Sequence, residues 1–321
     1  MNNFARVAPR REAKGLWAIT SYFNPVGYRQ RLANYRVFRE RLGIPLVAVE
    51  LAFGPEFELR EGDAEILVQL RGGDVMWQKE RLLNVALASL PSTCGKVTWL
   101  DCDVIFEAND WPERLNRLLD SFKLVQPFGQ VHYLSRDGIP GEIWPTEVEY
   151  VRTSVASEIA SGVPASITLG HRTESLEGTS ATGLAWAACR ELLDQHGFYD
   201  GCIVGAGDRA LACAAHGCFN EFIGSVCMNE QEKERFMAWA RPFYQAVCGA
   251  TGYLEGNLFH LWHGEARSRR ALARHKELGP FDFNPFEDIV IDRNGCWRWN
   301  TNKPEMHEYM RKYFASRKDD G

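Results

Sequence analysis

The sequence predicts an α/β protein with a mixed, mostly parallel central sheet and helices on both of its faces. Short apolar runs that suit buried strands alternate with segments whose apolar residues recur at helical spacing. The links between these runs are short, which implies right-handed crossovers between parallel strands. In such sheets, ligands bind beyond the carboxyl ends of the strands, so functional residues are expected there.

The first hundred residues predict two such strand–helix units. Asn24 is a suitable N-cap and Pro25 suits the first helical position, while Gly43 suits the end of the same helix. The expected elements are a strand at 16–20, a helix from Pro25 to Gly43, a strand at 46–50, a short strand at 65–70, and a helix from near Asp74 to Pro91.

The rest of the chain predicts further helices and strands around one poorly readable segment, 129–180, which is rich in Gly, Ser, Thr and Pro. The expected elements are a strand at 97–106, a helix from Trp111, a strand at 123–127, a helix near 149–161, helices at 187–196, 208–216 and 230–239, a basic helix at 267–276, a hairpin turning at 293–295, and a last helix to about Arg317.

Two carboxylates stand out in the strand expected at 97–106. Side chains alternate along a strand, so Asp101 and Asp103 should point the same way. Paired carboxylates repel each other and lose hydration at a buried strand end, and a divalent cation such as Mg²⁺ or Mn²⁺ compensates both effects. The alternative is a solvated strand end with two ordinary surface acids.

Composition narrows the class of protein. The chain has 321 residues, of which 45% are hydrophobic and 25% charged, and its net charge is -5. That balance argues against a general polyanion binder, although a local basic face remains compatible with it. Nine cysteines without a C-x-x-C pair predict reduced thiols in a cytoplasmic protein, and no apolar run reaches the roughly 20 residues of a membrane span.

The order of these parts resembles the nucleotide-sugar-dependent glycosyltransferases of the GT-A fold. That pattern has a Rossmann-like first half, a D-x-D at a strand end, a small-residue strand, a G-x-G-[DE]-like element and a late His. The matching pieces here are Asp101-Cys102-Asp103, Gly183-Leu184-Ala185-Trp186, Gly205-Ala206-Gly207-Asp208 and His260-Leu261-Trp262-His263-Gly264.

The resemblance also implies a division of the chain. A GT-A domain would cover residues 15–265, with a nucleotide-binding half at 15–106 and an acceptor half at 107–265. A loose basic arm would precede it at 1–14, and a C-terminal helix and hairpin extension would follow at 266–321.

The resemblance implies a metal-assisted transfer from a UDP-sugar, with glucose as the expected sugar. Asp103 would bind Mn²⁺ or Mg²⁺ directly, and Asp101 would bind the ribose or the metal through water. His260 and His263 would face opposite sides of a strand, so only one should reach the metal; His263 is preferred because Gly264 gives it a flexible setting. Asp208 would deprotonate the acceptor hydroxyl, or else serve simply as a helix N-cap.

The implied nucleotide contacts lie on the strand ends and on the helix before the metal strand. A solvated helix face or a packed core position is the alternative for any one of them, as it is for Trp77 and Trp186, which could stack on the base or sugar. The candidates are Thr20, Ser21, Tyr22, Asn24, Glu50, Lys79, Arg81 and Asn84.

A narrower resemblance concerns the acceptor. Ser21-Tyr22-Phe23-Asn24-Pro25, 205–211 and 260–264 look like base J glucosyltransferase and its bacteriophage relatives. These imply DNA modification, with a hydroxymethylpyrimidine base as acceptor, and the basic segments 6–14 and 267–276 could contact its phosphates. The net charge of -5 argues against DNA. Small-molecule, glycan or protein acceptors, a nucleotidyltransferase with the same two-acid site, and a non-catalytic binding module remain alternatives.

Overall fold

The computed structural model describes residues 15–138, 148–170 and 178–321. The expected basic arm at 1–14 and parts of the segment 129–180 lie outside these residues. A seven-stranded sheet with the order β10-β6-β9-β4-β1-β2-β3 forms the centre, and β9 alone among its strands runs antiparallel to its neighbours. Its strands are β1 (Leu16–Phe23), β2 (Leu46–Ala52), β3 (Ile66–Arg71), β4 (Lys96–Leu100), β6 (Leu124–Gln126), β9 (Ala185–Cys189) and β10 (Thr251–Tyr253).

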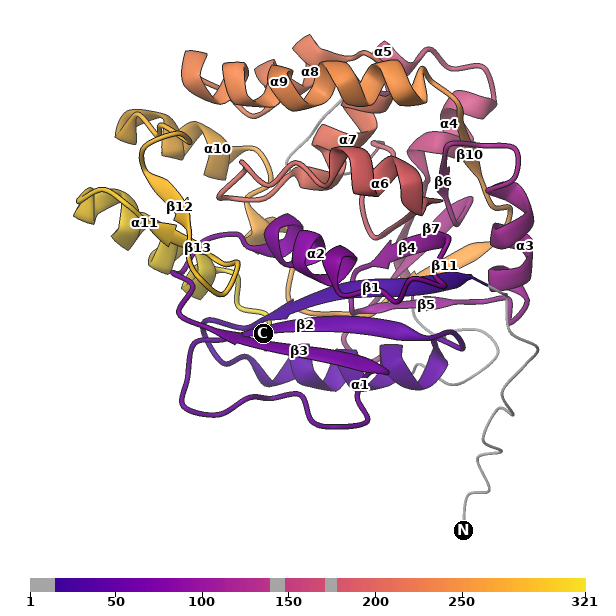
Figure 1. Cartoon of the computed structure of the whole chain (residues 1–321), viewed down its shortest axis with the longest axis horizontal. Helices are drawn as coiled ribbons and strands as arrows, with labels where there is room; N and C mark the ends of the chain where they lie inside the picture. The colour runs from indigo at the N-terminus through magenta and orange to yellow at the C-terminus, as the bar shows by residue number, and fades with distance from the viewer. Residues whose placement is uncertain (1–14, 139–147, 171–177) are drawn as a thin grey trace.

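Helices cover both faces of this sheet, which confirms the predicted mixed α/β class. Figure 1 shows α1 against one face and α2, α6 and α7 on the opposite side. The helices are α1 (Arg29–Arg41), α2 (Lys79–Ala88), α3 (Trp111–Leu118), α4 (Val155–Ala160), α5 (Ala165–Gly170), α6 (Arg190–His196), α7 (Gly207–Ala215), α8 (Phe219–Ser225), α9 (Glu230–Val247), α10 (Ala273–Leu278) and α11 (Pro304–Ser316). Within the described ranges, no helix combines the length and apolar character that a membrane crossing requires.

A second, four-stranded sheet with the order β5-β11-β7-β8 lies beside the first. Its strands are β5 (Val104–Phe106), β7 (Gln130–Leu134), β8 (Val148–Thr153) and β11 (Asn257–His260). The prediction of one strand over 97–106 is therefore wrong. The chain leaves the central sheet after Leu100, turns at 101–103, and enters the second sheet at Val104, because β5 pairs with β11 rather than continuing beside β1.

Several helix predictions also need correction. The chain from Asp74 to Trp77 is not helical, because its backbone N–H groups bind Trp297 O and Ile203 O instead of forming a first turn. The segment from Ala187 to Cys189 is part of β9, where small side chains fit between β4 and β6. The expected basic helix at 267–276 is broken at Arg270, whose φ of 49° is left-handed. The helix near 149–161 is β8 followed by the short α4.

The C-terminal region has the predicted hairpin and helix. Strands β12 (Ile289–Ile291) and β13 (Trp297–Trp299) flank the turn, and α11 follows them. Short 3₁₀ turns, η1 (Ala266–Arg269) and η2 (Gly279–Phe281), lie before the hairpin. Side chains of this region, including Trp297, Met310 and Phe314, join the same buried cluster as Ile19 and Val49 of the central sheet.

Candidate active site

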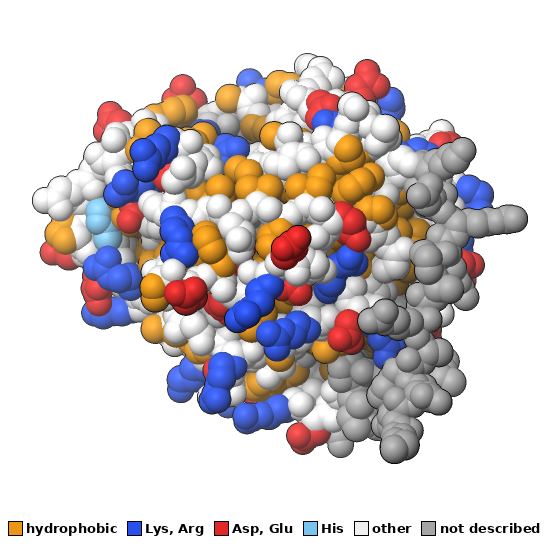
Figure 2. All heavy atoms as spheres, turned by 60° about the horizontal axis from the view of Figure 1, so that its bottom comes forward, with side chains coloured by type: hydrophobic (Ala, Val, Ile, Leu, Met, Phe, Trp, Pro, Cys, Tyr) orange, Lys and Arg blue, Asp and Glu red, His pale blue; other side chains and the backbone are white. Residues whose placement is uncertain are grey.

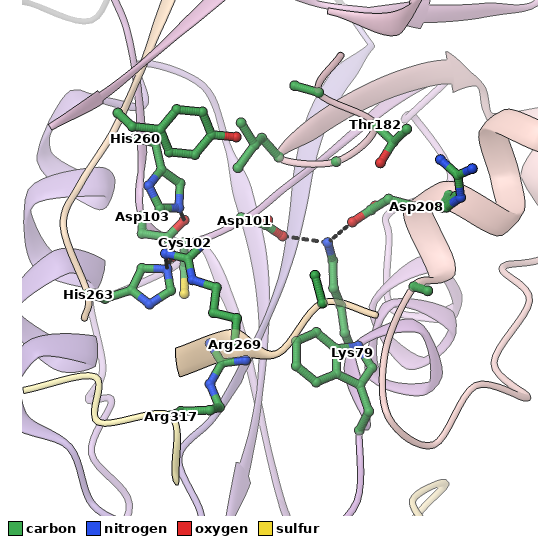
Figure 3. Close-up of a pocket in the computed structure, with 18 of the residues that line it drawn as sticks. Lys79, Asp101, Cys102, Asp103, Thr182, Asp208, His260, His263, Arg269 and Arg317 are labelled. Atoms are coloured by element: carbon green, nitrogen blue, oxygen red, sulfur yellow. Dashed lines mark hydrogen bonds and ion pairs between the residues drawn. The ribbon is translucent and has the colours of Figure 1, made fainter. Parts of the chain in front are cut away.

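A cavity of about 260 Å³ opens where β1 and β4 end, at the edge of the sheet that the sequence predicts for ligands. Residues that are far apart in the sequence line it. They come from the end of β1, α1, the start of α2, the turn 101–103, β7, β8, the segment 179–184, the start of α7, the segment 260–274, and Arg317 (Figure 3).

The two aspartates of the turn 101–103 have different partners. Asp101 Oδ1 lies 2.5 Å from Lys79 Nζ, whereas Asp103 Oδ2 lies 3.2 Å from His263 Nε2 (Figure 3). The backbone fixes this divergence, because Asp101 N–H donates to Leu184 O and Leu261 N–H donates to Asp103 O. The side-by-side arrangement expected from strand alternation does not occur, since the pair occupies a turn.

Asp103, His260 and His263 form a group that could hold a metal ion. One ligand atom from each lies within 4.8 Å of the others. Both histidines participate because His260 ends β11 and His263 follows in an irregular segment, where the strand alternation that should separate them does not apply. Asp101 lies outside this group and pairs with Lys79 instead.

The chemistry of this group suits a divalent cation. Asp103 Oδ1 is buried and has no hydrogen-bond donor among the described residues, so this acceptor oxygen is available to a cation. Burial lowers the pKa of His260 to about 3, which keeps its imidazole neutral, as a metal ligand must be. Burial alone would raise the pKa of Asp103, but the neighbouring His260 and His263 bring it well below its usual range. The residues present therefore fit a metal ion.

A second charged cluster lies across the cavity. Asp208 Oδ2 is 2.7 Å from Lys79 Nζ, so Lys79 bridges Asp208 and Asp101 (Figure 3). Although burial opposes it, these two carboxylates raise the pKa of Lys79 well above its usual value, and the amine stays protonated. Burial raises the pKa of Asp101 to about 6, with Lys79 opposing the shift.

Asp208 is not the N-cap that the alternative interpretation required. Ala206 occupies that position with a left-handed φ of 88°, and Asp208 follows in the first turn of α7. A carboxylate there is favoured by the helix dipole. A Cβ on Gly183 would come within 2.9 Å of Asp208 Oδ2, so the glycine backbone lies directly against the carboxylate.

Four of the five nucleotide candidates on the strand ends, Thr20, Tyr22, Asn24 and Glu50, are buried and bonded within the protein, whereas the fifth, Ser21, lines the cavity. Thr20 Oγ1 donates to Leu100 O at 2.7 Å, and Glu50 accepts from Glu58 N at 2.6 Å. Tyr22 OH and Asn24 Nδ2 donate to Glu58 carboxylate oxygens at 2.6 and 2.9 Å. The contacts of Tyr22, Asn24 and Glu50 hold the loop around Glu58 against the sheet, and none of these four candidates lines the cavity.

The three nucleotide candidates on α2 have different surroundings. Lys79 lines the cavity, while Arg81 pairs with Asp200 at 3.0 Å and Asn84 donates to Phe198 O at 3.0 Å. Arg81 and Asn84 thus hold the 198–200 loop. Of the two tryptophans, Trp186 is fully buried opposite Trp99 between β9 and β4, and Trp77 lines the cavity.

None of the six arginines at the site was among the predicted site residues. Seven Arg or Lys side chains line the cavity, against three aspartates, so it carries a positive charge in a chain of net charge -5. The guanidinium carbons of Arg274 and Arg317 lie 5.8 and 5.6 Å from the Trp77 ring centroid. The basic run at 267–276 was a signal for two of them, but the others are scattered along the chain. The missed residues are Arg31, Arg152, Arg209, Arg269, Arg274 and Arg317.

No protein-family model matches the chain, and no curated protein matches it. Solved structures similar to it include S. aureus TarS in complex with UDP-GlcNAc, at 12% identity and a TM-score of 0.41 over 79% of this chain and 60% of that one. Another is the mannosyltransferase PcManGT from Pyrobaculum calidifontis with GDP-Man and Mn²⁺, at 17% identity and 0.35 over 75% and 76%.

A third is the 4-diphosphocytidyl-2C-methyl-D-erythritol synthase of Anaerococcus prevotii, at 11% identity and a TM-score of 0.35 over 76% of this chain and 90% of that one. All three scores are too low to carry an argument about this chain's activity. The functional conclusion therefore depends on the residues of the cavity.

Proposed function

We propose that this protein is a metal-dependent glycosyltransferase that uses a nucleotide-sugar donor. One observation carries the proposal: a single cavity contains a metal-binding group, an excess of arginines and, opposite them, a carboxylate held by lysine. A nucleoside diphosphate is an anion that divalent cations and arginine forks both bind. The carboxylate then supplies a base on the acceptor side.

The reaction proposed is attack of an acceptor hydroxyl oxygen on the anomeric carbon of the sugar, with cleavage of the bond to the diphosphate. A bound metal ion would neutralise charge on the departing diphosphate. Asp208 would take the hydroxyl proton, and the protonated Lys79 lies 2.7 Å from its carboxylate. Asp101 shares the same ammonium, so Lys79 couples the donor side of the cavity to the acceptor side.

The proposed metal is Mn²⁺ and the proposed donor is a UDP-sugar. Two imidazoles and one carboxylate favour Mn²⁺ over Mg²⁺, because Mg²⁺ prefers a shell of oxygens. We propose a UDP-sugar, with UDP-glucose tested first, and a cytoplasmic setting. Direct ligation by Asp103, His260 and His263, with Asp101 reaching the metal or ribose through water, is part of this proposal.

The leading acceptor proposed from the sequence is a hydroxymethylpyrimidine base in DNA. One reason for this acceptor was that the basic segment 267–276 could contact DNA phosphates. That reason is weaker in the structure, because Arg269 and Arg274 face the cavity and Arg270 pairs with Glu277. On the side of the molecule where α1 lies, Lys and Arg are interspersed with Asp and Glu (Figure 2). Hydroxymethylated DNA is therefore assayed beside small-molecule, glycan and protein acceptors.

The test measures UDP release from UDP-sugars with Mn²⁺ and each acceptor. We expect metal-dependent release that is lost in Asp103→Asn and retained in Glu40→Gln, a matched change on the exposed surface of α1. Pyrophosphate formation from a nucleoside triphosphate would instead identify a nucleotidyltransferase. Metal-dependent UDP binding without turnover would identify a binding module, and absence of both binding and turnover with every nucleotide sugar would refute the proposal.

A further inference from the structure

The segment Arg317–Asp320 returns to the metal-binding group from the far end of the sequence. Gly264, directly after His263, has a φ of 82°, and a Cβ there would lie 2.5 Å from Lys318 O. Gly264 is thus required because residues 317–319 approach its backbone closely. It does not serve to make the setting of His263 flexible, as the sequence suggested.

The segment is anchored on the start of α1. The Asp320 carboxylate accepts the backbone N–H groups of Gln30 and Arg29 at 2.8 and 3.2 Å. Tyr28 OH donates to Ala315 O at 2.8 Å and accepts from Lys318 N at 3.0 Å. These bonds leave little freedom to the residue between them, Asp319.

The Asp319 carboxylate is fully buried and lies against the metal-binding group. It accepts from Arg31 Nε at 2.9 Å and from Arg317 Nε at 3.3 Å. Its Oδ1 lies 3.6 Å from Nδ1 of His263, slightly beyond hydrogen-bond distance. Nδ1 is itself buried and has no hydrogen-bond partner within residues 15–138, 148–170 and 178–321, so Asp319 is the acceptor that it faces.

The other ring nitrogen of His263 fixes where the proton belongs. Arg269 Nη2 lies 3.1 Å from Nε2, and a guanidinium can only donate, so Nε2 accepts. A neutral imidazole that accepts at Nε2 carries its proton on Nδ1, opposite Asp319. Nε2 also lies 3.2 Å from Asp103 Oδ2, so two acceptor atoms that a cation could bridge are side by side, and the Arg269 guanidinium lies next to Nε2.

We propose that Asp319 is a positioning residue that holds His263 in the Nδ1–H tautomer, with its Nε2 lone pair directed toward the metal. This rests on the metal site of the proposed function. Carboxylates that orient ligating histidines in this way raise ligand basicity and fix ring orientation. The segment 317–320 supplies no metal ligand in this proposal, but through Asp319 it orients one of the ligands.

The first test is spectroscopic and needs neither donor nor acceptor. Long-range ¹H–¹⁵N spectra of the metal-free protein with labelled histidine report the tautomer of each ring, and His263→Gln assigns the signal. We expect an Nδ1–H tautomer in the wild type and a mixture of tautomers in Asp319→Ala. An Nε2–H tautomer in the wild type would overturn the proposal.

The second test measures Mn²⁺ binding by calorimetry. We expect Asp319→Ala to weaken binding about 10- to 100-fold, and Asp319→Asn, which keeps an acceptor oxygen of the same size, to weaken it less. Asp194→Asn is the matched control, because Asp194 pairs with Arg190 on the exposed side of α6 and does not line the cavity, and it should bind Mn²⁺ as the wild type does.

Different outcomes would refute the metal site and the role of Asp319. Wild-type protein that binds no Mn²⁺ would refute the proposed metal site. Wild-type binding with equal affinity in Asp319→Asn and Asp319→Ala, both folded by circular dichroism, would refute the role of Asp319 alone. If Asp319→Ala does not fold, Asp319→Asn and the wild-type tautomer still decide the question.

Discussion

Replacing Gly264 by Ala probes the contact between the His263 segment and residues 317–319. The new Cβ would lie 2.5 Å from Lys318 O, about 0.9 Å inside the 3.4 Å of ordinary contact, and 3.2 Å from both Arg317 O and the Asp319 Cα. Because those atoms are backbone, the segment must move as a unit. Asp319 would then retreat from His263.

The expected cost has two parts. A left-handed φ costs a non-glycine residue roughly 1–2 kcal/mol, of which about 0.4–1 kcal/mol is offset by the lower entropy of the unfolded chain. Overpacking adds about 1–3 kcal/mol. Gly43→Ala isolates the first part, since Gly43 has a φ of 74° and open space around its Cβ position.

Urea unfolding of the two variants measures the difference. We expect Gly264→Ala to be less stable than Gly43→Ala by about 1–3 kcal/mol. We also expect weaker Mn²⁺ binding in Gly264→Ala and unchanged binding in Gly43→Ala. Equal stability of the two variants would show that residues 317–319 do not constrain Gly264, and the reasoning would fail.

Three further predictions concern the cavity. His260→Ala and His263→Ala should each weaken Mn²⁺ binding more than tenfold by calorimetry, with His307→Ala, which stacks on Trp299, unchanged; full binding in either site variant would remove that histidine from the ligand set. Lys79→Met should lower the free energy of unfolding by about 2–3 kcal/mol, because Asp101 and Asp208 lose the cation that they share. In a double-mutant cycle, adding Asp208→Asn should recover part of this loss, and strictly additive changes in stability would count against the Lys79 bridge. Burial raises the pKa of Glu80 to about 8, with Lys79 opposing, so the folded chain binds a proton that the unfolded chain releases near pH 4.5. The stability that this group contributes is present below that pH and is lost as pH rises through 8. In urea unfolding, the free energy of unfolding of Glu80→Gln should therefore rise relative to that of the wild type between pH 6 and pH 9. A difference between the two proteins that does not change with pH would contradict this.

The strands β1 to β3 and β6 were predictable because apolar runs are local signals, whereas β7 and β10 were not predicted and β8 was expected to be helical. Turns that depend on distant partners were not predictable. The apolar run 97–106 reads as one strand, yet it divides because Val104–Phe106 finds a partner in β11, more than 150 residues later. A single sequence carries no record of that pairing.

The candidate site was predictable to the same extent. The structure places Asp103, both late histidines, Lys79 and Asp208 around one cavity, which agrees with their proposed roles without testing them. Tyr22, Asn24 and Glu50 lie near the expected strand ends, but their buried polar groups bind the loop around Glu58, and Thr20 binds Leu100 O, so none of them is available to a nucleotide. Arg317 and Asp319 carry no local signal at all.

The bonds between Asp320 and the start of α1 join residues 290 and 291 positions apart, which has a consequence for how the protein is made. At 5–20 residues per second, a ribosome needs roughly 15–60 s to pass from one partner to the other. Contacts of such long sequence separation also form slowly after release. The nascent chain can thus assemble its central sheet early and still lack an ordered His263. Competence for metal binding would then arrive as a late folding step, after the bulk of the protein has already collapsed.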